Sequence, residues 1–173
     1  MDTSENPLLL APSGIEIRYT EPGDASYLKT WLMEPGVSRW FPMEDELEID
    51  DAVVRWIVFH RYKCSLTATK EGIPCGIATL YLQPYRKLAH QCEFGIIVGE
   101  GYRNQGIGSY LMSSVMHLAK EKFKIELLHL QVYDDNPAIH LYHRFGFREF
   151  GRQSAWIKNK GCYEGRVFME RPL

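Results

Sequence analysis

A glycine-bearing segment between two regular stretches of sequence has the composition of an anion-binding loop. It lies after the apolar, strand-like run 94–98 and before a helical pattern that begins at Ile107. It reads Gly101-Tyr102-Arg103-Asn104-Gln105-Gly106-Ile107-Gly108-Ser109. Gly106 and Gly108 have no side chains to keep an anion from the backbone, and the first turn of the helix has free N–H donors at its positive dipole end. We therefore predict that a diphosphate-bearing ligand binds here.

Two common nucleotide-binding motifs do not fit this loop. A dinucleotide fingerprint requires a third glycine three residues after Gly108, where this chain has Leu111, and no acidic partner for a ribose can be placed. A phosphate loop of the nucleotide-hydrolase type requires Gly-Lys-Ser/Thr, whereas Gly108 is followed by Ser109 and Tyr110. A glycine-rich turn without a ligand remains the structural alternative.

Two segments together resemble one superfamily. The Arg-x-x-Gly-x-Gly pattern at Arg103, Gly106 and Gly108 resembles the acetyl-CoA pyrophosphate loop of the GCN5-related N-acetyltransferase (GNAT) superfamily. About thirty residues later, 135–147 resembles its second signature, an asparagine and an Ala-x-x-Leu-Tyr helix that ends in Gly-Phe. The order of elements also matches over residues 15–170. The resemblance implies the GNAT fold: α/β (α+β), with a mixed central sheet of about seven strands flanked by four helices.

The resemblance also implies acetyl-CoA as the co-substrate, and no metal. Strand backbone would pair with the pantetheine arm if a local bulge leaves it unpaired, and the loop would hold the pyrophosphate. The family asparagine stands three residues before the alanine, where this chain has Asp135, while Asn136 stands two before, so either is a candidate. Both also suit a helix N-cap. The residues expected to contact acetyl-CoA, the acetyl carrier, are Ile96, Ile97, Val98, Arg103, Asn104, Gln105, Gly106, Ile107, Gly108, Ser109, Asn136 and Tyr142.

Acetyl transfer to an amine needs a deprotonated amine and a proton for the leaving thiolate. Tyr142 stands where the family often places a tyrosine near the sulfur, and a phenol of pKa ~10 is a reasonable general acid. Its alternative role is to pack a short helix against the sheet. Glu93 is the candidate base, since it is the only carboxylate in the strand before the loop and faces away from Phe94. A structural ion pair, or loss of the amine proton to water, would leave Glu93 without that role.

The bulk composition predicts one compact domain. The 173 residues are 45% hydrophobic and carry a net charge of −2, which excludes a globally basic surface for nucleic acid or acidic membranes. Residues 1–14 are expected to be a flexible segment ahead of a single domain at 15–173. No signal peptide or membrane span is predicted, and a cytoplasmic location follows.

The four cysteines lie far apart, without a Cys-x-x-Cys pair, and are expected to be reduced. None lies in either motif, which favours direct attack of the amine without a covalent enzyme intermediate. His140 and His143 lie three apart on the second-motif helix, but no third metal ligand suggests itself.

Hydrophobic periodicity predicts the elements that position these residues. Alternating residues indicate strands, and apolar residues three or four apart indicate helices. Two helices, near 24–32 and 53–58, follow the first strand, and one helix follows Pro137 and ends at Gly146. The long amphipathic helix runs from Ile107 to about Phe123. The expected strands are 15–19, 65–69, 75–82, 92–98, 128–132, 147–151 and 163–169.

The acceptor site is the least determined part of the interpretation. An acidic run at 44–51 could attract a cationic amine, or could simply favour the N-terminus of the following helix. Trp40, Phe41 and Trp156 could wall the acceptor or belong to the core. Specificity is expected in the loops 35–51, 84–91 and 154–162.

The sequence therefore favours an acetyl-CoA-dependent N-acetyltransferase acting on a primary amine. A small-molecule amine is preferred, with a peptide N-terminus or a lysine as further possibilities, and the family suggests a homodimer. The alternative is a catalytically inactive acyl-CoA-binding sensor, and a nucleotide-binding protein is a third reading.

Overall fold

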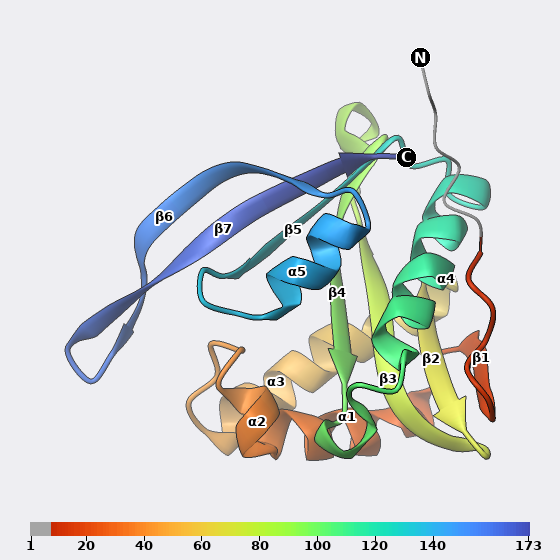
Figure 1. The fold of residues 1–173 in the computed structure, drawn as a ribbon, viewed down its shortest axis with the longest axis horizontal. Helices are drawn as coiled ribbons and strands as arrows, with labels where there is room; N and C mark the ends of the chain where they lie inside the picture. The colour runs from red at the N-terminus through yellow and green to blue at the C-terminus, as the bar shows by residue number, and fades with distance from the viewer. Residues whose placement is uncertain (1–7) are drawn as a thin grey trace.

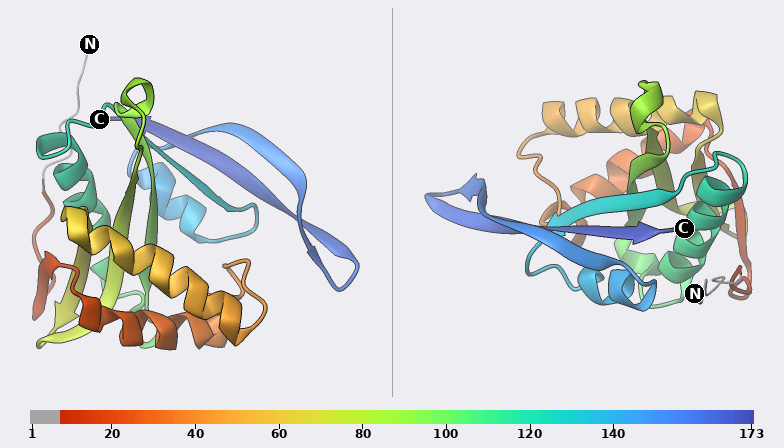
Figure 2. Two further views of the ribbon diagram at one scale, coloured as in Figure 1. Left: turned by 180° about the vertical axis from the view of Figure 1, so that it is seen from behind. Right: turned by 90° about the horizontal axis from the view of Figure 1, so that it is seen from above.

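The structure is a computed structural model that describes residues 8–173, and it has three layers (Figure 1). A central sheet carries helices α1 to α3 on one face and α4 and α5 on the other, as Figure 2 shows from behind and from above. The helices are α1 (Ala25–Met33), α2 (Pro35–Ser38), α3 (Glu46–Ile57), α4 (Ile107–Glu121) and α5 (Ala138–Arg144).

The sheet is mixed, and its order within the described residues is β1-β2-β3-β4-β5-β7-β6. All neighbouring strands are antiparallel except β4 and β5, which are parallel. The seven-stranded α/β sheet expected from the sequence is thus confirmed. The strands are β1 (Ile15–Tyr19), β2 (Ser65–Lys70), β3 (Ile73–Leu82), β4 (Gln91–Val98), β5 (Leu127–Tyr133), β6 (Arg148–Asn159) and β7 (Cys162–Pro172).

Two details differ from the sequence expectation. Five helices rather than four flank the described sheet, because the four-residue α2 forms where a loop is expected; Pro35 begins it, at a position whose N–H needs no helical partner. The last two strands are also longer, with 12 and 11 residues. They pair as a hairpin that projects well beyond the body of the molecule (Figure 1).

The sheet opens between its two parallel strands. β4 and β5 pair only at their beginnings, where Gln91–Glu93 lies beside Leu127–His129. Beyond these three pairs the strands diverge (Figure 1), although β4 remains paired with β3 and β5 with β7. We call the space between residues 94–98 and 130–133 the split. It leaves one edge of each strand without a strand partner.

Separate apolar cores fill the two sides of the sheet. The larger lies under α4 and α5, and α4 contributes the stripe Leu111, Val115 and Leu118 that its periodicity predicts. The smaller lies under α1 to α3, where Leu28, Trp31 and Leu32 of α1 pack on Ile77 and Ile97. Each helix layer is therefore fixed to the sheet independently.

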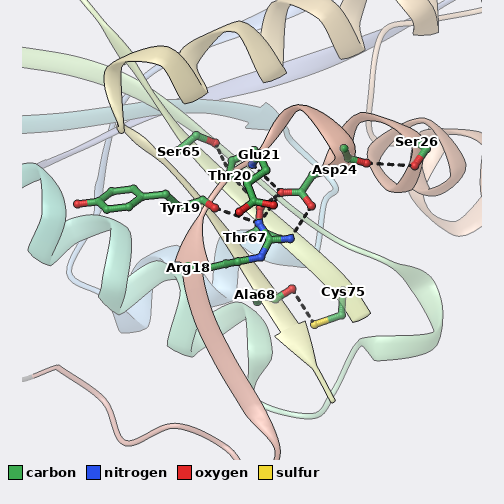
Figure 3. Close-up of polar contacts among 11 residues, drawn as sticks. Arg18, Tyr19, Thr20, Glu21, Asp24, Ser26, Ser65, Thr67, Ala68 and Cys75 are labelled. Atoms are coloured by element: carbon green, nitrogen blue, oxygen red, sulfur yellow. Dashed lines mark hydrogen bonds and ion pairs between the residues drawn. The ribbon is translucent and has the colours of Figure 1, made fainter. Parts of the chain in front are cut away.

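A buried polar cluster fixes the corner between β1 and α1 (Figure 3). Arg18 donates to both oxygens of Asp24 at 2.8 and 2.7 Å, and Asp24 also accepts from the Glu21 N–H and the Thr67 hydroxyl. Burial alone would raise the pKa of Asp24, but these donors outweigh it and hold the pKa below its ordinary value. The cluster ties the start of α1 to β2.

The first described residues lie along α4. The Leu9 N–H donates to the Ser113 hydroxyl at 3.0 Å, and the Gly14 carbonyl accepts from the Glu71 N–H. The flexible segment expected at 1–14 falls partly on residues 1–7, which lie outside the described residues. Over residues 8–173, helices of the length and apolar character needed to cross a bilayer do not occur.

Candidate active site

A cavity of about 780 Å³ occupies the split and reaches both faces of the sheet. On the α1–α3 face its wall includes Trp40 and Trp56, and on the other face Ser109 and Tyr142. Residues of β4 and β5 line it between these ends. Two ligands can therefore meet within one cavity after entering from opposite faces of the sheet.

The β4 edge in the split offers backbone groups. The Gly99 N–H donates to the Cys75 carbonyl opposite it, which fixes which residues of β4 bond to β3. Because antiparallel ladders alternate, Ile97 bonds to β3, whereas the backbone groups of Phe94, Ile96 and Val98 face the split. The structure thus makes Ile96 and Val98 available to a ligand, but not the backbone of Ile97, whose side chain is buried in the smaller core.

The free edge does not depend on a bulge. The register between β3 and β4 runs without a shift from the pair Gly76–Val98 to Leu82–Cys92. The sequence interpretation required a local bulge to free these groups. The divergence of β4 from β5 frees them instead.

The glycine loop leads directly into α4. Gly106 has φ +79° and precedes the first helical residue, Ile107, a conformation that glycine adopts without strain. The Tyr110 N–H donates to the Gly106 carbonyl, so the N–H groups of residues 107–109 have no partner within the helix, and no side chain caps them. Gly108 lines the cavity, and its nearest neighbours lie 3.9 Å from an added Cβ. This helix end is suited to an anion.

Several side chains of the loop have other partners. Arg103 donates to the Gly36 carbonyl at 2.8 Å and to the Val98 carbonyl at 3.4 Å. Gln105 donates to the Gly101 carbonyl and accepts from Lys70, outside the cavity wall. Ile107 is buried in the larger core. Arg103, Asn104, Gly106, Gly108 and Ser109 do line the cavity, so backbone groups dominate this part of the site.

Asn136, rather than Asp135, reaches the cavity. The side-chain amide oxygen of Asn136 accepts from the Ala138 N–H at 2.9 Å, which caps α5, and the residue lines the cavity wall. Asp135 instead lies 3.8 Å from Arg39 and is outside the wall. Of the two candidates, only Asn136 lines the cavity, and its side chain also caps α5.

Tyr142 is both a packing residue and a cavity residue. Its ring lies edge-on to Phe94 and Phe147, with centroids 6.3 and 6.1 Å away, and the residue is 8% exposed. Burial raises the pKa of its hydroxyl to about 12. The phenol therefore keeps its proton at neutral pH. Because Tyr142 lines the cavity, that proton is available at the split.

Glu93 lines the cavity from the opposite face of β4. Its carboxylate accepts from the Gln131 side-chain N–H at 2.9 Å, across the split from β5. Arg166 of β7 donates to the Gln131 side-chain oxygen and, at 2.9 Å, to Gln153. Glu93 is thus oriented by a row of side chains that crosses three strands.

Sequence reasoning missed several cavity residues. Gln131 and Tyr133 alternate with Leu130 and Val132 along β5, and this polar or aromatic face was the available signal. Trp56 and Tyr81 gave no signal, because they lie on a helix and a strand remote in sequence from either motif. Trp40, Phe41 and Trp156 all line the cavity, and Phe41 also packs against the smaller core.

The acidic run 44–51 lies outside the cavity wall. Asp45 caps α3 by accepting from the Glu48 N–H, Glu46 and Asp50 pair with Lys29, and Asp51 pairs with Arg55. These contacts match the structural role of the run.

Thiols and metal-ligating residues contribute little to the described site. Cys64, Cys75 and Cys92 are buried, and burial raises their pKa values to about 11, 11 and 12. None of them lines the cavity. Within residues 8–173 we found no group of three or more His, Cys, Asp or Glu placed to hold a metal.

Solved structures share this fold over most of the chain. A ribosomal-protein-alanine N-acetyltransferase from Brucella melitensis superposes with a TM-score of 0.76 at 22% identity, covering 91% of this chain and 99% of that chain. The yncA structure from Salmonella typhimurium, solved with its cofactor acetyl-CoA, superposes with a TM-score of 0.75 at 16% identity, covering 92% and 94%. The fold is therefore the GNAT fold.

The chain belongs to the acetyltransferase (GNAT) family, whose model matches residues 26–147. It is 29% identical over 107 residues to the L-amino acid N-acetyltransferase AaaT of Escherichia coli strain K12, covering 61% of this chain. It is 44% identical over 55 residues, 31% of this chain, to an N-alpha-acetyltransferase of Sulfurisphaera tokodaii. The aligned segments span 66% and 33% of those two relatives.

Proposed function

We propose that this chain is an acetyl-CoA-dependent N-acetyltransferase that transfers an acetyl group to a small primary amine by direct attack. The cavity through the split carries the proposal. It joins an uncapped helix N-terminus, a free strand edge and a protonated phenol on the α4–α5 side to a carboxylate on the α1–α3 side. Membership of the family supports the same reaction class.

The residues of the α4–α5 side fit a pantetheine and diphosphate carrier. The backbone of Ile96 and Val98 would pair with amide groups, and the N–H groups of residues 107–109 would bind the phosphates. Gly108 leaves the space for that approach. Asn136 has a side-chain NH₂ group free for the carrier once its oxygen caps α5. Bound acetyl-CoA supplies the acetyl group and a thiol leaving group.

Glu93 and Tyr142 would move the protons. Glu93 accepts a proton from the acceptor ammonium, directly or through water, which gives the nitrogen a free electron pair. As the N–C bond forms and the C–S bond breaks, Tyr142 donates its proton towards the departing sulfur. The second proton of the nitrogen passes through water to the Tyr142 phenolate, and Glu93 releases its proton to solvent. The products are an N-acetyl amine and a free thiol. Buried, protonated cysteines outside the cavity support direct attack over a covalent enzyme intermediate.

The names of the relatives support an amine acceptor. The E. coli relative is an L-amino acid N-acetyltransferase, and the S. tokodaii relative is an N-alpha-acetyltransferase. A small amine fits a cavity shared with a carrier, and a peptide N-terminus is the second choice. A homodimer and a cytoplasmic location stay predictions from the sequence.

Thermal unfolding with acetyl-CoA, ATP or NAD, followed by thiol release with added amines, tests the proposal. A ligand at 100 times its dissociation constant stabilises the fold by about 2.7 kcal/mol. We expect a selective shift with acetyl-CoA and amine-dependent thiol release. A shift without release to any amine would instead indicate the acyl-CoA-binding sensor, and equal shifts with ATP or NAD would indicate a nucleotide-binding protein.

A further inference from the structure

Six aromatic side chains wall the part of the cavity that opens towards α1–α3, and we call this part the aromatic slot. They come from the segment after α2, from α3, and from strands β3, β5 and β6. Its members are Trp40, Phe41, Trp56, Tyr81, Tyr133 and Trp156.

The rings form two rows of edge-to-face contacts. In one row Trp56 contacts Phe41 and Tyr81, with centroids 6.2 and 6.1 Å apart. In the other, Tyr133 contacts Trp40 and Trp156, with centroids 6.2 and 4.9 Å apart. The central ring of each row, Trp56 or Tyr133, has a ring neighbour on both sides and so loses little further freedom when a ligand binds. The slot is therefore a preformed apolar site.

The slot has a carboxylate beside its rings. Trp56 and Tyr81 pack directly on Gly95 of β4, where an added Cβ would lie 2.9 and 2.7 Å from them. Glu93, two residues earlier on the same strand, has its side chain on the same side of β4. Glu93 is also the neighbour of Tyr81 in the strand register. An ammonium at Glu93 would thus lie beside the aromatic rings.

The charges around the slot distinguish between classes of amine. Among the described residues that line the cavity, Glu93 is the only carboxylate. The acidic run 44–51 lies outside the wall and is occupied by a helix cap and ion pairs, so it does not serve a second or third cationic group. A polyamine would bring a second ammonium group that finds no further carboxylate in the described cavity wall, and the guanidinium groups of Arg39 and Arg166, which lie over Trp40 and Trp156, would repel it. A lysine in a peptide would leave peptide groups without hydrogen-bond partners against the rings, which is costly.

We infer that the acceptor is a primary amine carried on an aromatic or similarly flat apolar group, an inference that rests on the proposed function. The ammonium binds Glu93 and the rings beside it, with cation–π attraction adding to the ion pair. The aromatic group fills the slot between the two rows. The products are the N-acetylated form of this amine and the free thiol.

Matched acceptors test this class. Thiol release from acetyl-CoA is measured with phenylethylamine, ethylamine and spermidine as acceptors. We expect kcat/KM for phenylethylamine to exceed that for ethylamine roughly tenfold or more, because the phenyl ring leaves water on binding. We expect spermidine to be no better than ethylamine.

Two substitutions on β6 connect that preference to the slot. Trp156→Leu removes one slot ring, whereas Phe150→Leu removes an aromatic ring that is 57% exposed and outside the cavity wall. Trp156→Leu should lower the phenylethylamine-to-ethylamine ratio of kcat/KM roughly tenfold, mainly through KM for the aromatic amine. Phe150→Leu should keep the wild-type ratio. Thermal unfolding of both variants with acetyl-CoA verifies that each remains folded and binds the carrier.

The outcomes separate this inference from the proposed function. Spermidine or ethylamine turned over as fast as phenylethylamine would overturn the aromatic class while leaving the acetyltransferase intact. An unchanged ratio in Trp156→Leu would overturn the slot as its cause. Failure of all amines, with no stabilisation by acetyl-CoA, would overturn both proposals.

Discussion

Gln131 donates a hydrogen bond to Glu93 across the split, and Arg166 determines which way the Gln131 amide lies. Arginine has only donors, so the Gln131 oxygen must face Arg166 and its NH₂ group must face the carboxylate. The contact therefore fixes the orientation of the Glu93 carboxylate at the cavity wall.

Gln131→Leu removes that donor, and we expect kcat/KM at neutral pH to fall roughly tenfold. The fall is expected because the Glu93 carboxylate loses the contact that orients it. The measurement is kcat/KM for the acceptor amine, from thiol release with saturating acetyl-CoA.

Gln91→Leu is the matched control for that measurement, because Gln91 begins β4 outside the cavity wall. It should keep the wild-type kcat/KM. Wild-type kcat/KM in Gln131→Leu would show that this contact does not position a catalytic carboxylate.

Tyr142→Phe keeps the ring between Phe94 and Phe147 but removes the proton donor. We expect kcat to fall roughly 10²-fold or more with little change in thermal stability. Burial raises the pKa of Tyr142 to about 12, so the phenol is protonated throughout the assay range. The pH profile of kcat should therefore keep every limb that wild type shows below pH ~10. Tyr163→Phe, at a 61% exposed position on β7, should be silent. Wild-type kcat in Tyr142→Phe, with chemistry limiting, would refute the acid assignment.

Gly106→Ala and Gly108→Ala should have different effects. Gly106 has φ +79°, so alanine there is strained and should cost about 1–2 kcal/mol of unfolding free energy. Gly108 has an ordinary φ and room for a methyl group, so the fold should tolerate alanine. The methyl group adds to the cavity wall, and KM for acetyl-CoA should rise roughly ten- to a hundredfold.

Urea unfolding and acetyl-CoA titrations of both variants make the comparison. Gly23→Ala, with no atom near its added Cβ and no link to the cavity, is the control. Unchanged acetyl-CoA affinity in Gly108→Ala would count against the helix N-terminus as the phosphate site.

Asp24→Asn tests the cluster that fixes α1 to the sheet. Leaving the Arg18 guanidinium without its carboxylate should cost about 2–4 kcal/mol at pH 7. The folded pKa of Asp24 lies below its unfolded value, so the stabilisation is complete above the unfolded pKa of ~3.9 and is lost as the pH falls through the folded value. The difference between wild type and variant should therefore shrink in acid.

Urea unfolding at pH 7 and below pH 4 measures that difference. Asp51→Asn breaks only an exposed pair with Arg55 and should cost about 0.5 kcal/mol or less at either pH. A difference that is constant with pH would show that the Asp24 charge is not the source of stability.

Periodic segments were the predictable part of this fold. β1 and the start of α4 lie where alternation and the three-to-four spacing place them. The four-residue α2 is too short to show a period. β6 continues through Gln153 to Asn159, which do not alternate, because β7 supplies the pairing that its own sequence does not indicate.

The candidate site was predictable only where one segment contains it. The glycine loop and Tyr142 could be identified because motifs carry them. The contact from Arg166 to Gln131 depends on β5 and β7 being neighbours. Whether the Ile97 backbone faces β3 or the split depends on which residues of β4 form hydrogen bonds to β3. Both follow from tertiary pairing, which a single sequence does not display.

The three residue pairs between β4 and β5 have a mechanical consequence. They join two half-sheets, β1–β4 and β5–β7, and the glycine loop belongs to the first half while Asn136 and Tyr142 belong to the second. A ligand that contacts both therefore acts as a cross-link between them. Its binding should slow backbone hydrogen exchange in β5 and β7 as well as in the loop. Exchange in the β5–β7 half-sheet would then reveal whether the ligand occupies a site formed largely by the β1–β4 half.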